Sequence, residues 1–338
     1  MPAPKTEISE IVTALGMTAA PTLEAGLAAP TAAFVNVPAG VWARLRTSYE
    51  AGEHADLFGV AWDNGRAFLA AADALRGRPP ARIEWRGPTR PVGYDTIPAD
   101  LRVDHVYLVS CKHLSRVLHN IAPAHLFERA LIVRRGSEPT TDWYLAIAGD
   151  AYQTFYDAVR EVVAIPGLPR SVSALSSAQR NVLRRALSDG KRWPGSLGAP
   201  YVEFAHTVAR ASAARWSMQL SSKSTREEQL WRLLRHASAP YFVLGASVRD
   251  PMRLRIATPW DWRQAFEFRS FDIVADEAAA QPQVRWASTV RRRSDGAELV
   301  VSGYVEIRWS HGRFRQPPEA KVQLSTNHED VPGYFALH

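Results

Sequence analysis

The alternation of apolar and polar residues predicts a mixed α/β protein. Residues 41–50 and 53–75 repeat apolar side chains at helical spacing, whereas residues 81–86 alternate them with the two-residue period of a strand. Short apolar runs rich in β-branched and aromatic residues predict further strands at 97–103 and 105–111. This part of the chain is therefore expected to be helical first and then to form three consecutive strands.

The pattern continues with two more helices and a strand. Residues 114–133 and 152–163 carry apolar stripes typical of helices, and the short apolar run at 143–148 predicts a strand between them. Nearer the C-terminus strands predominate, and a β-hairpin is expected where 286–293 and 299–309 flank a Ser-Asp-Gly turn.

We expect three regions along the chain. Residues 1–52 would form an N-terminal arm with short helices, residues 53–165 an α/β core, and residues 166–338 a second half of mixed helices and strands. The boundary between the last two is placed where the chain becomes rich in proline and serine.

Composition narrows the class of protein. Hydrophobic residues make up 46% and charged residues 22%, which is typical of a globular chain. No apolar run approaches the length of a membrane span and no secretory signal is visible, so a cytoplasmic protein without membrane contact is expected. The single cysteine, Cys111, excludes an internal disulfide framework and a cysteine zinc cluster, and we expect it to be a small buried apolar residue.

The charge balance favours an anionic partner. Lysine and arginine number 41 against 34 aspartate and glutamate residues, and most of the excess is arginine. The planar guanidinium donates two parallel hydrogen bonds to a phosphate, which suits nucleic acid or another polyanion. An arginine-rich solvated surface would give the same balance.

One stretch brings a carboxylate and an ammonium group to neighbouring strands. Asp100 lies on one predicted strand, and Ser110-Cys111-Lys112 closes the next. Because side chains alternate along a strand, Ser110 and Lys112 share one face and Cys111 points to the other. A carboxylate facing an ammonium at a strand end suits a divalent metal and a phosphate. The alternative is an ordinary ion pair at a sheet edge.

The predicted order of elements, with Pro98-x-Asp100 on the second strand and x-x-Lys112 closing the third, resembles the PD-(D/E)XK phosphodiesterase superfamily. The resemblance covers residues 53–150 and implies a restriction-endonuclease-like core. It implies a Mg²⁺- or Mn²⁺-dependent endonuclease that hydrolyses double-stranded DNA in restriction, defence or repair and leaves a 5′-phosphate. By position, Asp100 resembles the metal-binding carboxylate and Lys112 the catalytic lysine of that pattern.

Ser110 departs from the pattern, which has aspartate or glutamate at this place. A hydroxyl is neutral and a weaker ligand than carboxylate for a hard cation. Glu84, on the polar face of the preceding strand, is the first candidate for a replacement metal ligand, and Asp63, on the helix before it, is the second. Asp104 and Asp95 are further candidates. Otherwise the metal would bind through water, or the site would be inactive.

Polar residues beyond Lys112 are candidates for contact with nucleic acid. On the helix predicted after Lys112 they are His113, Arg116 and Asn120; at the tip of the predicted hairpin they are Arg291, Arg292 and Arg293. Their position beside the metal site, or on an exposed turn, would let them contact phosphates or base edges. A solvated surface is the alternative for each of them.

Three functions remain open at this point. The first is a nuclease whose C-terminal half binds the target, with a homodimer expected if both strands are cut. The second is a nucleic-acid-binding protein with an inactive nuclease fold, which the replacement at Ser110 favours. The third is a structural or partner-binding protein that does not bind nucleic acid.

Overall fold

The fold is mixed α/β, as the sequence predicts, with one seven-stranded and one five-stranded sheet among the described residues. The computed structural model describes residues 4–87, 99–113, 117–128, 142–187, 193–237, 240–246 and 251–338. No helix within these ranges is both long enough and apolar enough to cross a membrane.

The chain divides into two compact units, and both are discontinuous in sequence. Unit 1 comprises residues 1–115, 235–266 and 328–338, and unit 2 comprises residues 116–234 and 267–327. The boundary expected after residue 165 falls inside unit 2, because the chain enters this unit at residue 116 and leaves it twice.

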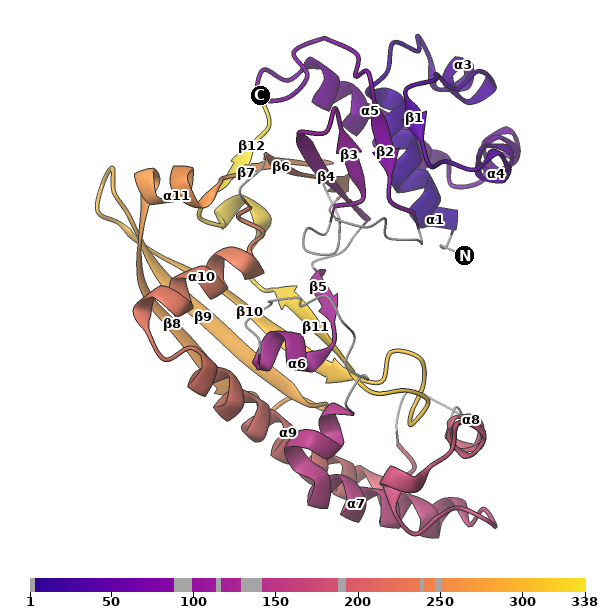
Figure 1. Cartoon of the computed structure of the whole chain (residues 1–338), viewed down its shortest axis with the longest axis vertical. Coiled ribbons are helices and arrows are strands. Elements are labelled where there is room, and N and C mark those ends of the chain that lie inside the picture. The colour runs from indigo at the N-terminus through magenta and orange to yellow at the C-terminus, as the bar shows by residue number, and fades with distance from the viewer. Residues whose placement is uncertain are drawn as a thin grey trace. The chain divides into compact units, whose positions relative to one another are not determined.

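Helices at the N-terminus of unit 1 form one layer beside its sheet (Figure 1). Its first segment runs without a break through α1 (Pro4–Glu7), the π-helical η1 (Ile8–Val12) and α2 (Thr13–Gly16). Next come α3 (Leu23–Ala28), α4 (Ala39–Glu50) and α5 (Ala55–Ala70). The helices predicted at 41–50 and within 53–75 are confirmed.

Two glycines set how closely the first helical segment approaches α5. A Cβ atom on Gly65 would collide with the Thr13 carbonyl oxygen, and one on Gly16 would collide with the Trp62 carbonyl oxygen. Gly65 leaves α5 unbroken, so its effect is to allow this close crossing. The contact holds η1, and with it Glu10, against the rest of the unit.

The sheet of unit 1 has the strand order β1-β2-β3-β4-β6-β7-β12. Strands β2, β3 and β4 form an antiparallel meander, β4 lies parallel to β6, and β6, β7 and β12 are antiparallel. In the turn between β3 and β4, Asp104 and His105 are both at positive φ. The strand bounds are β1 (Phe34–Val35), β2 (Ile83–Trp85), β3 (Leu101–Val103), β4 (Tyr107–His113), β6 (Tyr241–Ala246), β7 (Pro251–Ile256) and β12 (Tyr334–Ala336).

The N-terminal helices cover one face of this sheet. Val109 and Cys111 of β4, with Phe242 and Leu244 of β6, join the apolar core formed with these helices. Strand alternation places Ser110 and Lys112 on the opposite face, as the sequence predicts. The unit is completed by α11 (Pro259–Ala265) and the short η4 (His328–Asp330).

Unit 2 is built on an antiparallel sheet with the order β5-β11-β10-β9-β8. Helix α9 packs on β9, and α7 packs against α9 (Figure 1). The predicted hairpin is confirmed, with Val290 of β9 opposite Leu299 of β10. The strands are β5 (Val117–Ile121), β8 (Phe266–Ala275), β9 (Gln283–Arg292), β10 (Glu298–Arg308) and β11 (Glu319–Leu324). The helices are α6 (Pro123–Phe127), α7 (Trp143–Val163), η2 (Val172–Ala174), α8 (Ser177–Ala186), η3 (Gly195–Leu197), α9 (Gly198–Gln219) and α10 (Lys223–Leu233).

Two predicted elements are wrong. The helix expected over 114–133 contains strand β5 and the short helix α6, because β5 pairs with β11, a strand about two hundred residues further along the chain. The strand expected at 143–148 is the first part of α7, which starts after Asp142, whose side chain accepts a hydrogen bond from the Tyr144 N–H. Tertiary pairing and an N-cap thus override the local apolar pattern.

Candidate functional site

Asp100 lies directly before β3, beside the end of β4. Its Oδ2 atom accepts hydrogen bonds from the Ser110 hydroxyl at 3.0 Å and from the Cys111 backbone N–H at 2.6 Å. The backbone N–H of Asp100 donates to the Val109 carbonyl at 2.8 Å. These contacts hold the carboxylate at the junction that the sequence predicts for it, next to Ser110.

Glu10 of η1 is a second carboxylate at this junction, and the sequence analysis missed it. The Trp85 indole N–H donates to Glu10 Oε2 at 2.6 Å. Burial, and after it the negative charge of Asp100, raise the pKa of Glu10 to about 8 against the lowering effects of Trp85 and Lys112. Without a cation, Glu10 is therefore mostly protonated at pH 7.

A sequence signal for Glu10 was available. Ile8, Ile11, Val12 and Leu15 are spaced as one buried helical stripe, and all of them are in the core. This stripe predicts that the helix carrying Glu10 packs into the core. The expectation of an N-terminal arm over residues 1–52 did not take it into account.

Lys112 interacts electrostatically with both carboxylates, and more strongly with Asp100 than with Glu10. Burial lowers its pKa, the attraction of Asp100 raises it, and the repulsion of Arg235 lowers it again. The backbone of Lys112 packs closely against Gly245 of β6. A Cβ atom on Gly245 would collide with the Lys112 carbonyl oxygen. A side chain at position 245 would push β4 away and displace the lysine.

Two arginines add positive charge to this side of unit 1. Arg86 is buried and donates from Nη1 to the Ala99 carbonyl at 2.9 Å, one residue before Asp100. Arg235 has a left-handed backbone, with φ of 66°, which is uncommon outside glycine. Burial lowers the pKa of Arg235, and Tyr241, Tyr334 and Asp100 oppose that effect. Arg86, Lys112 and Arg235 are therefore three basic side chains in the neighbourhood of Asp100.

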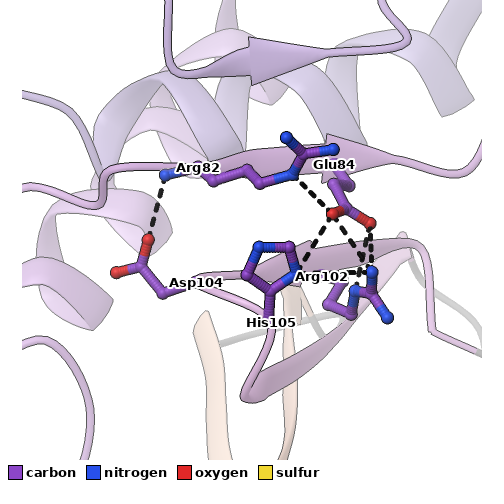
Figure 2. A network of polar contacts seen from close by, with 5 residues as sticks. All are labelled: Arg82, Glu84, Arg102, Asp104 and His105. Atoms are coloured by element: carbon purple, nitrogen blue, oxygen red, sulfur yellow. Dashed lines mark hydrogen bonds and ion pairs between the residues drawn. The ribbon is translucent and has the colours of Figure 1, made fainter.

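Glu84 is held by positive side chains on the β2–β3 surface (Figure 2). Its carboxylate forms ion pairs with Arg102 at 2.9 Å and Arg82 at 2.7 Å, and His105 Nδ1 lies 3.4 Å away. Asp104, also drawn in Figure 2, accepts a hydrogen bond from the Arg82 backbone N–H at 2.9 Å. These two carboxylates are thus engaged in a local network.

The other predicted metal ligands are not brought to Asp100 by any described contact. Asp63 is exposed on α5, and Asp95 lies outside the described residues. The carboxylate whose charge interacts with that of Asp100 is Glu10, and neither Glu84 nor Asp63 is among the causes of the raised pKa of Glu10.

The predicted nucleic-acid contacts do not lie on one helix. Asn120 is exposed on β5 of unit 2, opposite Lys321 of β11. His113 ends β4, and its side chain, like Arg116 as a whole, lies outside the described residues. His119, one residue before Asn120, is buried in β5, and its Nε2 atom lies 3.0 Å from the Arg232 carbonyl oxygen.

The three arginines of the hairpin lie near its turn, as predicted. Arg291 Nε is 3.8 Å from Glu267 Oε2, and Arg292 Nη1 is 2.9 Å from Asp295 Oδ2. Arg293 is exposed. The first two therefore have carboxylate partners within the unit, and both remain partly accessible.

The donor set beside Asp100 can be tested against the expected cation. No group of three or more histidine, cysteine, aspartate or glutamate side chains suited to a metal is found among the described residues. Mg²⁺ keeps several water ligands and commonly uses one or two carboxylates together with a substrate phosphate. The pair Glu10 and Asp100 fits that requirement, because a bound cation would relieve the repulsion that helps to protonate Glu10.

Comparisons of this chain with protein-family models, with curated proteins and with solved structures gave no match.

Proposed function

We propose that the chain is a metal-dependent nuclease that hydrolyses phosphodiester bonds in double-stranded DNA. The observation that carries this proposal is that Asp100, fixed by hydrogen bonds to Ser110 and Cys111, interacts electrostatically with Glu10 of η1 and Lys112 of β4. Two interacting carboxylates and one lysine of lowered pKa form a set suited to phosphoryl chemistry.

Glu10 and Asp100 would hold Mg²⁺ or Mn²⁺, which lowers the pKa of a bound water and offsets negative charge on the phosphate. Lys112 would orient the attacking water and stabilise the charge that builds on the non-bridging oxygens. The water oxygen bonds to phosphorus, the bond to the 3′-oxygen breaks, and that oxygen takes up a proton. The products are a 3′-hydroxyl and a 5′-phosphate.

Positive charge around Asp100 supports an anionic substrate. Arg86, Lys112 and Arg235 place three basic side chains beside the two carboxylates, and a protonated Glu10 contributes no negative charge. Arginine guanidinium groups bind phosphate oxygens in pairs, so they would also align the scissile group.

The test is cleavage of supercoiled plasmid DNA by purified full-length protein in Mg²⁺ or Mn²⁺. We expect Asp100→Asn, Glu10→Gln and Lys112→Met each to lower the rate by about 10²-fold or more, since each removes a group that acts at the reacting phosphate. Glu84→Gln and Asp63→Asn, which remove the two carboxylates first expected from the sequence, should leave cleavage near the wild-type rate.

The two sets of variants separate this site from its alternatives. Loss of cleavage in Glu84→Gln with retention in Glu10→Gln would reject Glu10 as a metal ligand. Cleavage that survives in Asp100→Asn would reject the site as a whole. Sedimentation of the protein with and without DNA would show whether two copies act on the two strands.

A second candidate is nucleic-acid binding without cleavage. It is supported by the contacts of Asp100, whose Oδ2 atom already accepts from Ser110 and Cys111. In that case Asp100 serves to order the β3–β4 junction. The protein would cleave no DNA with either metal, and its affinity for DNA would still fall with rising salt concentration. Salt-dependent binding with no cleavage in either metal would select this candidate.

A further inference from the structure

Unit 2 contains a pocket of about 630 Å³ that is unrelated to Asp100 and its neighbours. A volume in this range suits a small organic ligand. The pocket lies where the start of β9, the end of β10 and the segments around Trp193 and Tyr201 meet. Its lining includes the aromatic residues Trp193, Tyr201 and Trp309 and the arginines Arg285, Arg308 and Arg313.

Aromatic rings form a continuous wall of this pocket. The ring centroids of Trp193 and Tyr201 are 4.8 Å apart, and Trp193 is 6.3 Å from Trp309. Behind them Trp309 stacks on Phe314 at 4.9 Å, so the wall is anchored in the interior of the unit. Rings held in place by packing can receive a planar ligand with little loss of conformational entropy.

Arg313 extends that wall. Its guanidinium carbon lies 3.9 Å from the centroid of the Trp193 ring, and one Nη1–H donates to the Leu187 carbonyl at 2.9 Å. A guanidinium held over an indole offers a planar, charged surface on which nucleobases stack and to which phosphates bind. Among the described residues, no ion pair joins Arg313 to a carboxylate within 4.0 Å.

The remaining polar groups favour an anionic, hydrogen-bonding ligand. Asp276 is the lining carboxylate, and it accepts hydrogen bonds from Arg285 at 2.6 Å and from Gln283 at 2.9 Å, so its charge is already balanced. The Trp309 indole N–H is buried and has no hydrogen-bond partner among the described residues. Arg308 Nη1 lies 3.4 Å from Glu306 Oε2, so among the lining arginines Arg313 is the one for which no carboxylate partner is found in the described residues. Its charge disfavours a cationic ligand, and the polar groups disfavour a purely apolar one.

We propose that this pocket binds one nucleotide, with its base against the aromatic wall and its phosphate at Arg313 and Arg308. Gln281 and Gln283 also line the pocket, and amide side chains can pair with the edge of a base. The nucleotide is either a free monophosphate or an unpaired nucleotide of a DNA strand, since both present the same base, sugar and phosphate. This proposal does not depend on the nuclease proposal.

Calorimetric titration of full-length Asp100→Asn protein in EDTA tests the proposal without cleavage. The probes are the four deoxynucleoside 5′-monophosphates and the matching nucleosides. Arg313→Ala should weaken binding of the preferred monophosphate by about ten-fold or more, because a charge-assisted contact is lost, and should weaken nucleoside binding much less. Arg313→Lys should recover part of the loss.

The matched control is Arg269→Ala, which removes an exposed arginine of β8 outside the pocket and should leave binding unchanged. Arg308→Ala gives a second pocket variant, and thermal unfolding of each variant checks that it is folded. A DNA duplex with one bulged nucleotide, compared with a fully paired duplex, distinguishes the two sources of the nucleotide. A preference for the bulged duplex that depends on Arg313 would show that the pocket binds an unpaired nucleotide of a DNA strand. Binding of the monophosphates without a preference for the bulge would show that the ligand is a free nucleotide.

Two results would overturn the proposal. One is that neither monophosphates nor bulged DNA bind at millimolar concentration to folded protein. The other is that Arg313→Ala and Arg269→Ala change binding equally. The calorimetric assay contains no metal and measures binding to the pocket of unit 2. Either result therefore has no bearing on the plasmid cleavage test of unit 1.

Discussion

Around Asp100, unit 1 holds two carboxylates and three cationic side chains, whereas the interior of unit 2 around Phe155 is made of stacked aromatic rings. Phe155 stacks on Phe204 at 5.3 Å and lies edge-on to Trp193 at 5.0 Å. Burial there needs no charge, while burial beside Asp100 raises the pKa of Glu10 and lowers that of Lys112. The aromatic interior stabilises unit 2, whereas the buried charged groups beside Asp100 reduce the stability of unit 1 and provide reactive side chains.

The largest effect is expected from breaking the aromatic interior. Phe155→Ala removes a fully buried ring from several stacked neighbours, so it should destabilise unit 2 by about 3–5 kcal/mol. Native-state hydrogen exchange should show the loss in α7 and α9 and leave α5 of unit 1 protected. Val202→Ala, at an exposed position of α9, is the control and should change stability by less than about 0.5 kcal/mol. Equal loss of protection in α5 would mean that the two interiors unfold as one.

A smaller effect of opposite sign is expected from Glu10→Gln. The pKa of Glu10 is raised to about 8, so between pH 4.5 and 8 the folded protein binds more protons than the unfolded chain, and its stability falls as pH rises. Glutamine does not titrate and should stabilise unit 1 at pH 8.5 by on the order of 2 kcal/mol relative to wild type, with little difference at pH 4.5.

Thermal unfolding at the two pH values measures this difference. Asp63→Asn on the exposed surface of α5 is the matched control and should show no such pH dependence. Addition of Mg²⁺ at pH 8.5 should raise the unfolding temperature of wild type more than that of Glu10→Gln. Identical pH slopes for wild type and Glu10→Gln would show that Glu10 is not buried beside Asp100.

The smallest effect on stability is expected at the hairpin. Arg292 is partly exposed and pairs with Asp295 at 2.9 Å, so Arg292→Ala should cost less than about 0.5 kcal/mol. If this arginine contacts a DNA phosphate, the slope of log affinity against log salt should fall by about 1 in the variant. Binding of DNA with an unchanged salt slope would exclude this contact.

The part of the site formed by neighbouring strands could be predicted from the sequence. Asp100 directly precedes β3 and Ser110 lies on β4, the next antiparallel strand, and strand alternation places Ser110 and Lys112 on one face. Glu10 could not be assigned in this way, because its distance from Asp100 depends on how η1 packs on α5 and the sheet. Arg235 enters through a segment more than a hundred residues after Lys112, which no local pattern connects to the site.

The same distinction applies to the fold. The β9–β10 hairpin was predictable because its pairing is local and its turn residues are visible in the sequence. Strand β5 was assigned to a helix because its partner, β11, follows about two hundred residues later. The apolar run at 143–148 was predicted to be a strand, but a short apolar run also fits a buried helix, and the N-cap at Asp142 starts a helix there.

The discontinuity of unit 1 has a consequence for synthesis on the ribosome. Strand β4 needs β6, which begins at Tyr241, and β7 needs β12, which begins at Tyr334. Residues 116–234 of unit 2 are translated between β4 and β6, and residues 267–327 between β7 and β12, so one edge of β7 stays unpaired until β12 has been made. The nascent chain must therefore keep the first unit incomplete while the second one folds, and chains released early would expose a strand edge prone to aggregation.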